Sequence, residues 1–279
     1  MHRSDLFARR AFLRGVAPAL AAVPLSRVLS GCGATATTPA TSDTGASTDS
    51  GLVDAPAADT AVVPWATGGT ASMKGAYADP FATGLGTACS VYKASTLGPC
   101  YAKTLDRQDI SEGSLGLPTR LALLVVDPSC KPLSGATVDL WHCSPVGLYS
   151  GDDASDMCTS RNAAARAARW FRGVRATNAQ GRVDFDTCYP GWYASRTIHI
   201  HFTVRVGGTE YVTSQLFFLD LLNDEIIASQ PLYKERGGKD TTNAADKVIT
   251  EAALSDCFFS TAKQADGALL AWKALVVHA

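Results

Sequence analysis

One alternating segment strongly limits the folds open to this chain. Residues 197–206 alternate polar and apolar side chains, which is typical of a β-strand with one buried face. Gly207 and Gly208 follow as a hairpin turn, and residues 210–218 form the return strand. The sequence therefore predicts an antiparallel β-hairpin over residues 197–218.

Further segments have strand character. Residues 120–127 form an apolar run, and residues 136–142 and 181–187 each alternate after a turn. Several short strands at this spacing predict an all-β sandwich or barrel. Helical signals are weak and predict only short helices, within residues 162–170 and 243–253.

The composition suits a globular protein and gives no indication of a nucleic-acid partner. The chain has 279 residues, enough for one large domain or two small ones, and 46% of them are hydrophobic. That fraction allows a sizeable core. The formal net charge is −1, so no basic balance points to nucleic acid. We expect no nucleic-acid partner.

The first 32 residues resemble a bacterial export signal. Arg9 and Arg10 resemble a twin-arginine signal, and residues 16–25 form an apolar stretch too short to span a bilayer. Residues 29–32, Leu-Ser-Gly-Cys, resemble a lipobox in which Cys32 would carry the lipid. The prediction is an exported protein, lipid-anchored at the cell envelope and facing the periplasm or the exterior. The alternative is a disordered N-terminus with a chance arginine pair and a buried cysteine.

The next segment differs in composition from the rest of the chain. Residues 33–85 are poor in large apolar side chains and rich in Ala, Thr, Ser, Gly and Asp. Such a segment buries too little surface to offset the entropy of ordering, which predicts a flexible polar tether. The alternative is a small subdomain around Val62, Val63 and Trp65. Residues 86–279 are predicted to form the folded domain.

The cysteines favour disulfides over a zinc site. The chain has 8 Cys, with no Cys-x-x-Cys pair. Scattered cysteines in an exported protein more often form disulfides. Removing Cys32 leaves an odd number, so at least one cysteine is free or paired with another chain, and the pairing stays open.

Two histidines on the predicted hairpin are the first candidates for metal binding. His199 and His201 are two residues apart on a strand, so their imidazoles point to the same face. The alternative is a pair of core or surface histidines. Tyr193 follows a Pro-Gly turn six positions before His199, and Arg196 stands between them. Tyr149 ends the loop that follows the strand at residues 136–142.

Four stretches together resemble the intradiol ring-cleavage dioxygenases. Residues 135–149 read Gly-Ala-x-Val-x-Leu-Trp-His and then Gly-x-Tyr. Residues 181–202 contain Gly-x-Val-x-Phe-x-Thr, then Tyr-Pro-Gly-Trp-Tyr, then Arg-x-x-His-Ile-His-Phe. Residues 171–174 and 213–218 also match. The resemblance covers about residues 98–243, and its most specific part is the order Pro-Gly-x-Tyr, Arg, His-x-His.

The resemblance implies a fold and a metal. The expected fold is a β-sandwich dioxygenase core with few short helices. The expected cofactor is one non-haem Fe(III), with Tyr193 and His199 as axial ligands and Tyr149 and His201 as equatorial ligands. Two phenolates and two imidazoles also suit a trivalent, oxophilic ion on chemical grounds, better than zinc or Cu(I).

The resemblance also implies an oxidoreductase reaction used in the catabolism of aromatic compounds. A catechol-type substrate and O2 would react so that the ring opens between the two hydroxylated carbons, giving a muconate-type diacid. Tyr193 would leave the metal and accept one substrate proton. Arg196 matches the arginine that stabilises negative charge on the ring, and Gln215 matches a glutamine beside the ligands.

The sequence departs from the family at several positions. Leu97 and Cys100 stand where the family carries glutamate and an aromatic residue around a Gly-Pro pair. Only five residues separate Tyr193 from His199, fewer than in the catechol and protocatechuate enzymes. The helical N-terminal dimerisation segment of the catechol enzymes is also missing. The chain therefore looks like the shorter, exported relatives of protocatechuate 3,4-dioxygenase and catechol 1,2-dioxygenase.

Other interpretations of the same residues stay open. The domain could be a surface-anchored β-sandwich binding module with a decayed or structural metal site, or it could bind iron or copper for another oxidation. Arg196 could be a surface salt-bridge partner, and Gln215 could face solvent. His142 is expected to be structural, and Tyr189 competes with Tyr193 as a ligand. The particular catechol and the oligomeric state stay undetermined.

Overall fold

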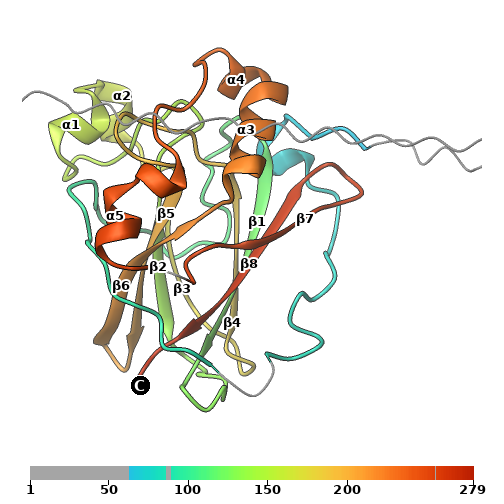
Figure 1. Ribbon diagram of the computed structural model, residues 1–279, viewed down its shortest axis with the longest axis vertical. Helices are drawn as coiled ribbons and strands as arrows, with labels where there is room; N and C mark the ends of the chain where they lie inside the picture. Colours follow the sequence, from blue (N-terminus) through green and yellow to red (C-terminus); the bar gives the residue numbers. More distant parts are fainter. Residues whose placement is uncertain (1–62, 86–88, 255) are drawn as a thin grey trace, which may run out of the picture. The chain divides into compact units, whose positions relative to one another are not determined.

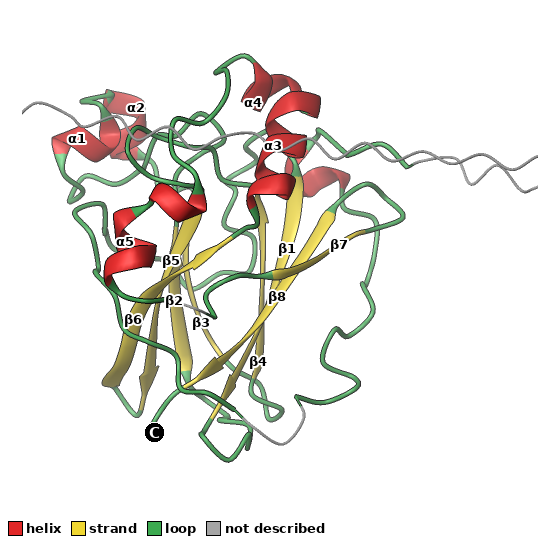
Figure 2. Ribbon diagram, viewed as in Figure 1, coloured by secondary structure: helices red, strands yellow, loops and turns green. Residues whose placement is uncertain are grey.

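Two four-stranded sheets form the framework of the protein (Figures 1 and 2). The computed structural model describes residues 63–85, 89–254 and 256–279. The predicted export signal, Cys32 and residues 33–62 of the predicted tether lie outside the described residues. Within them, no helix has the length and apolar character needed to cross a membrane.

The first sheet has the strand order β4-β1-β8-β7. Its strands are β4 (Arg182–Cys188), β1 (Pro118–Val126), β8 (Leu269–Val276) and β7 (Ser260–Lys263). β1 and β8 are parallel, and the other neighbours are antiparallel. The sequence did not predict β7 and β8, although β8 pairs with β1 along its full length.

The second sheet has the order β3-β2-β5-β6 and is antiparallel throughout. Its strands are β3 (Arg172–Ala176), β2 (Thr137–Trp141), β5 (His199–Val206) and β6 (Thr209–Phe217). β5 and β6 are the predicted hairpin. Gly207 and Gly208 form its turn with φ of 56° and 85°, a backbone region that glycine adopts at little cost.

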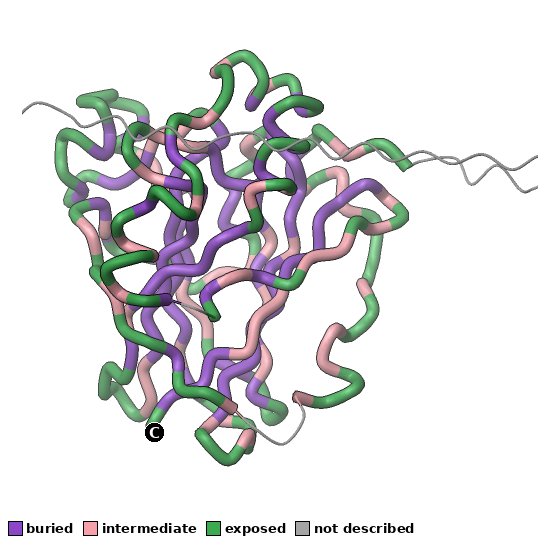
Figure 3. Tube along the Cα trace, in the orientation of Figure 1, coloured by how far each residue is buried: buried purple, intermediate pink, exposed green. Residues whose placement is uncertain are grey.

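Apolar side chains from both sheets meet in one core. Leu121, Leu123 and Val125 of β1 and Ile200 and Phe202 of β5 belong to it, and none is exposed. Figure 3 shows the buried stretches running along the strands of both sheets. The predicted all-β sandwich is therefore confirmed. Alternation along β5 sends Ile200 into this core and its two histidine neighbours to the opposite face.

The helices are short; all but η1, which precedes the first strand, lie in connections between strands (Figure 2). Predicted helical segments appear as α2 (Ala163–Ala167) and as η2 (Asn243–Ala245) followed by α5 (Lys247–Glu251). The remaining helices are η1 (Gly69–Ser72), α1 (Asp156–Thr159), α3 (Asp220–Ser229) and α4 (Pro231–Lys234). α3 was not expected from the sequence.

Residues 63–85, assigned from composition to the tether, pack on the sandwich. Trp65 packs against the core, and its Nε1 donates to Glu225 Oε1 at 2.8 Å. The backbone N–H of Ala66 donates to Gly267 O at 2.9 Å, and the Tyr77 hydroxyl donates to Asp266. The folded part of the described chain therefore begins before residue 86, because these few aromatic side chains find partners far along the sequence.

Four of the seven cysteines that follow Cys32 form disulfides. Cys89 pairs with Cys130, and Cys100 pairs with Cys158. The other three, Cys143, Cys188 and Cys257, are buried free thiols. Cys100 is one of the positions at which the sequence departs from the family pattern. Its cysteine forms one half of the Cys100–Cys158 disulfide.

Candidate functional site

The two histidines of β5 lie on the face of the sheet opposite the core, yet both are buried. Each is 2% exposed, because loops cover this face of the strand. Their Nε2 atoms are 3.2 Å apart. The Nδ1–H of His199 donates to the Thr197 carbonyl at 2.7 Å, which leaves the Nε2 lone pair free to bind another group.

His201 is held by its neighbours in a different way. The Trp141 indole stacks on its imidazole, with ring centroids 5.0 Å apart and planes inclined by 10°. Gly98 approaches so closely that a Cβ atom there would lie 3.1 Å from His201 Cε1, and its φ of +73° also favours glycine. The backbone of the loop at Gly98 therefore packs directly against the imidazole.

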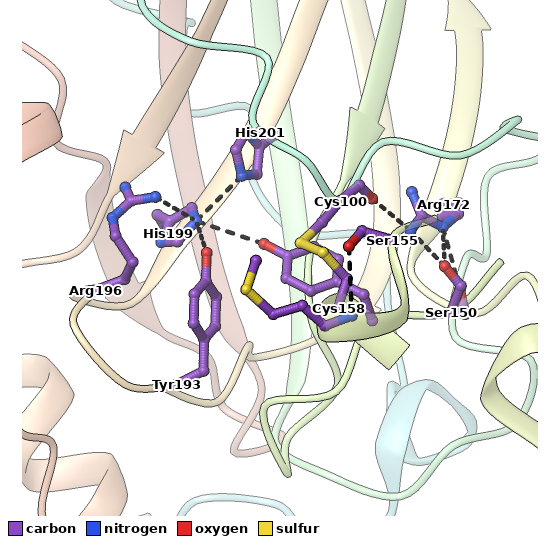
Figure 4. Close-up of a disulfide and its surroundings, with 11 residues drawn as sticks. Cys100, Ser150, Ser155, Cys158, Arg172, Tyr193, Arg196, His199 and His201 are labelled. Atoms are coloured by element: carbon purple, nitrogen blue, oxygen red, sulfur yellow. Dashed lines mark hydrogen bonds between the residues drawn. A yellow bond between two sulfur atoms is a disulfide. The ribbon is translucent and has the colours of Figure 1, made fainter. Parts of the chain in front are cut away.

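The two predicted tyrosine ligands reach the same point from two loops, and Figure 4 shows Tyr193 pointing toward His199. The Tyr193 hydroxyl lies 3.0 Å from His199 Nε2, and the Tyr149 hydroxyl lies 3.5 Å from the same atom. Tyr149 is 1% exposed. Four donor atoms from β5 and two loops thus converge on one buried position.

Glycines allow these two loops to interlock. A Cβ atom on Gly147 would lie 2.2 Å from the carbonyl oxygen of Trp192, and one on Gly191 would lie 2.2 Å from that of Pro145. Both distances are too short for any side chain. The glycines in Gly-x-Tyr and Pro-Gly-x-Tyr are therefore required by the close approach of the loop before Tyr149 to the loop before Tyr193.

Burial controls the protonation of the cluster. It lowers the pKa of His199 and of His201 well below the usual value. It also raises the pKa of Tyr193 to about 12 and the pKa of Tyr149 well above its usual value. Neutral imidazoles are ready to act as ligands. Two phenolates buried here need a cation to balance them, so the donor set fits a hard, trivalent metal ion.

The cluster differs from metal sites built only from histidine, cysteine and carboxylates. No group of three or more such residues is placed to hold a metal ion within the part of the chain that the structure describes. Here two of the four donors are phenols. A site of this composition is therefore recognised from its tyrosines as well as from its histidines.

Arg196 lies beside the four donors, with its Nη1 3.5 Å from His199 Nε2. Its Nη2 donates to Gln215 Oε1 at 2.5 Å, and its Nε donates to Asp246 at 2.8 Å. Gln215 pairs with His201 across the β5–β6 ladder, is fully buried, and donates to the Thr96 carbonyl. The structure therefore places Arg196 and Gln215 at the cluster, and Gln215 does not face solvent.

Asp246 is a site residue that the sequence did not indicate. Its side chain is fully buried, forms an ion pair with Arg196 and accepts from the backbone N–H of Thr197 at 2.9 Å. It also caps α5 by accepting from the Val248 N–H. An aspartate at the start of a weak helical pattern suggests a cap, but nothing local links it to an arginine 50 positions earlier.

The competing candidates lie outside the cluster. His142 is fully buried, with Nδ1 2.8 Å from the Cys143 carbonyl and Nε2 2.8 Å from Thr187 Oγ1, which is a structural arrangement. The Tyr189 hydroxyl donates to Asn223 Oδ1 at 2.5 Å. The structure thus brings Tyr193, and not Tyr189, to the histidines.

Comparison with known proteins finds relatives among the dioxygenases. A family model described as Dioxygenase matches residues 92–260. A chlorocatechol 1,2-dioxygenase from Pseudomonas putida is 30% identical over 104 residues, which cover 31% of this chain and 36% of that protein. Catechol 1,2-dioxygenase 1 from Acinetobacter lwoffii is 28% identical over 109 residues, covering 33% and 32% of the two chains. The chain thus matches about a third of the length of these relatives.

A solved structure matches over a longer stretch. An intradiol ring-cleavage dioxygenase from Tetranychus urticae superposes with a TM-score of 0.60 at 26% identity, covering 68% of this chain and 94% of that one. The family match spans more than half of the 279 residues, and the fold agrees with it. The chain therefore belongs to the intradiol ring-cleavage dioxygenase family.

Proposed function

We propose that the protein is a non-haem Fe(III) dioxygenase that opens the ring of a catechol-type substrate between its two hydroxylated carbons, with O2, to give a muconate-type diacid. The observation that carries the proposal is the convergence of two phenol oxygens and a second imidazole within 3.0–3.5 Å of His199 Nε2. Relatives named as catechol and chlorocatechol dioxygenases support the substrate class.

In this proposal Tyr149, Tyr193, His199 and His201 hold the ion. Bound Fe(III) would supply Lewis-acid chemistry that activates a catechol-type substrate toward O2. Tyr193 is the better placed of the two phenols to take a substrate proton, since it is partly buried whereas Tyr149 is enclosed.

Arg196 supplies fixed positive charge next to the position of the substrate. Its contacts with Asp246 and Gln215 hold the guanidinium in place before any substrate binds. A preorganised charge of this kind stabilises negative charge that develops on the ring without reorganising during the reaction. The loops over the buried histidines keep bulk water away from the same region.

We also propose that the protein is exported and anchored by a lipid on Cys32. The twin-arginine pattern, the short apolar stretch and the Leu-Ser-Gly-Cys sequence support this location. Two disulfides in the folded part are consistent with an oxidising compartment.

The test is a visible spectrum and an iron assay on the full-length chain, before and after catechol is added without oxygen. We expect about one iron per chain and a tyrosinate-to-Fe(III) band that shifts when catechol binds. Tyr149→Phe should weaken the band. Tyr189→Phe is the matched control, because Tyr189 is equally buried but lies outside the cluster, and it should keep the band.

Two results would contradict the proposal. One is a colourless chain that iron cannot restore, which would favour the surface-anchored binding module. The other is a coloured iron protein whose band does not respond to catechol and which forms no diacid when O2 is admitted. That result would favour another oxidation at the same cluster.

A further inference from the structure

A closed ring of contacts surrounds the backbone at Tyr149. The proposed chemistry uses the Tyr149 phenol but gives no role to these contacts. On one side the backbone N–H of Tyr149 donates to the carbonyl of Cys158 at 2.9 Å. On the other side the carbonyl of Ser150, the next residue, accepts from the guanidinium of Arg172. Figure 4 shows these groups gathered next to the histidine and tyrosine cluster.

Arg172 is an unusual buried cation. The residue is fully buried, and its guanidinium binds backbone carbonyls: Ser150 O at 2.9 Å from Nε and 2.5 Å from Nη2, and Cys100 O at 2.7 Å from Nη2. Its Nη1 has no hydrogen-bond partner among the residues that the structure describes. Among the described residues no carboxylate pairs with it, and its Cζ lies 5.9 Å from the centre of the Tyr149 ring. Burying a charge without a counter-ion is costly, and here hydrogen bonds to backbone carbonyls offset only part of that cost.

The Cys100–Cys158 disulfide completes the ring. The carbonyl of Cys158 accepts from the Tyr149 N–H. The carbonyls of Cys100 and Ser150 both accept from the guanidinium of Arg172. Cys100 also belongs to the loop whose Gly98 packs against His201. One covalent bond and one guanidinium therefore connect the supports of Tyr149 to the loop that packs on His201.

We propose that Arg172 and the Cys100–Cys158 disulfide act as positioning residues that fix Tyr149 and the Gly98 loop in the geometry needed to bind the metal ion. This inference rests on the proposed function. We call this set of contacts the Tyr149 clamp.

The physical basis of the clamp is preorganisation. The backbone is held on both sides of Tyr149, so its phenol does not have to be ordered when the ion arrives. Arg172 suits this role because a planar guanidinium donates to two carbonyls at once, whereas an ammonium group acts as a single compact charge.

The chain offers a matched control for the disulfide. Cys89–Cys130 closes 41 residues and Cys100–Cys158 closes 58, so the two bonds restrict the unfolded chain to a similar extent. The control disulfide lies away from the histidine and tyrosine cluster: its Cys89 lines a cavity near Phe81 and Trp272. The paired variants are Cys100→Ser/Cys158→Ser and Cys89→Ser/Cys130→Ser.

The first measurement uses the iron-free full-length chain. Amide hydrogen exchange at Tyr149 reports the clamp directly, without any metal. We expect exchange at least about tenfold faster in Cys100→Ser/Cys158→Ser and in Arg172→Met, and unchanged in Cys89→Ser/Cys130→Ser. Arg172→Lys keeps the charge but cannot hold both carbonyls, so its exchange should stay close to that of Arg172→Met.

The second measurement is iron affinity together with the energy of the tyrosinate band. We expect about a tenfold loss of affinity and a shifted band in the two clamp variants and in Arg172→Lys, with neither change in the control pair. Circular dichroism checks that each variant is folded. If Arg172→Met does not fold, Arg172→Lys carries the comparison.

The outcomes separate the clamp from the proposed function. Equal exchange and equal iron affinity in clamp and control variants, with a coloured wild-type protein, would overturn the clamp and leave the dioxygenase proposal intact. Full recovery by Arg172→Lys would show that charge alone matters and would also overturn it. A wild-type chain that binds no iron would defeat the proposed function, while faster exchange in the clamp variants would still support the structural role.

Discussion

Replacing Asp246 by alanine should destabilise the protein strongly, because this buried carboxylate accepts hydrogen bonds from the Arg196 side chain and from three backbone N–H groups, those of Thr197, Val248 and Ile249. The Asp246 side chain is 0% exposed, whereas that of Arg196, its ion-pair partner, is 17% exposed. Breaking a buried pair costs about 3–5 kcal/mol, and the partial exposure of Arg196 favours the lower end. Loss of the α5 cap adds about 1 kcal/mol. We expect about 4 kcal/mol in all.

Asp246→Asn separates charge from shape. Asparagine keeps an oxygen that can accept from the Thr197 N–H and cap α5, but it does not neutralise Arg196. We expect a loss of about 2 kcal/mol, since a hydrogen bond to a charged group is worth about 1.5–3 kcal/mol. Urea unfolding of the iron-free full-length chain measures both variants from their midpoints, provided that the slopes agree.

An exposed ion pair provides the control for this prediction. Asp156 pairs with Arg166 at 2.8 Å, but their side chains are 54% and 45% exposed. Asp156→Asn should therefore cost less than about 1 kcal/mol. If Asp246→Ala lowered the free energy of unfolding no more than Asp156→Asn, the argument that a buried carboxylate holds Arg196 would be refuted.

Three further predictions concern stability in acid, the Gly98 loop and the lipid anchor. Burial lowers the pKa of His142 from 6.5 to about 4, so its neutral imidazole contributes fully to the free energy of unfolding above about pH 6.5, and this contribution is lost as the pH falls toward 4. In His142→Gln, the free energy of unfolding measured by urea titration should therefore fall by up to about 3 kcal/mol less over the same pH range. Gly98→Ala should reduce iron affinity at least about tenfold, because its Cβ would meet the His201 ring; Gly113→Ala, with the same φ of +73° and open space around it, should not. Cys32→Ser should move the protein from the membrane fraction to the soluble fraction and abolish the lipid mass shift.

Local patterns in the sequence were enough to predict the hairpin whose first strand carries both histidines. Alternation over residues 197–206 and the two glycines after it specify the β5–β6 hairpin, because side-chain direction in a strand has a period of two. The same period places His199 and His201 on one face. The family motif then added Tyr149 and Tyr193, and the structure brings both to the histidines.

Other features depend on parts of the chain that are far apart in the sequence. β8 enters the first sheet between β1 and β7, and no local pattern specifies that position. Composition alone assigned Trp65 and Ala66 to a tether, and it carries no information about their distant partners. Trp65 bonds to Glu225 of α3, 160 residues away, and the backbone of Ala66 bonds to Gly267. Long-range packing therefore decided where the folded part begins.

The sequence by itself determined which residue types could form a metal site and which strand would present two of them. Only the tertiary structure paired Cys100 with Cys158, placed Arg172 beneath Tyr149 and brought Asp246 to Arg196. Strand periodicity is a property of neighbouring residues, so it can be seen in the sequence. The supports of the site are contacts between loops, and their geometry is set by the order of the strands in the two sheets and by the path of each connection between them.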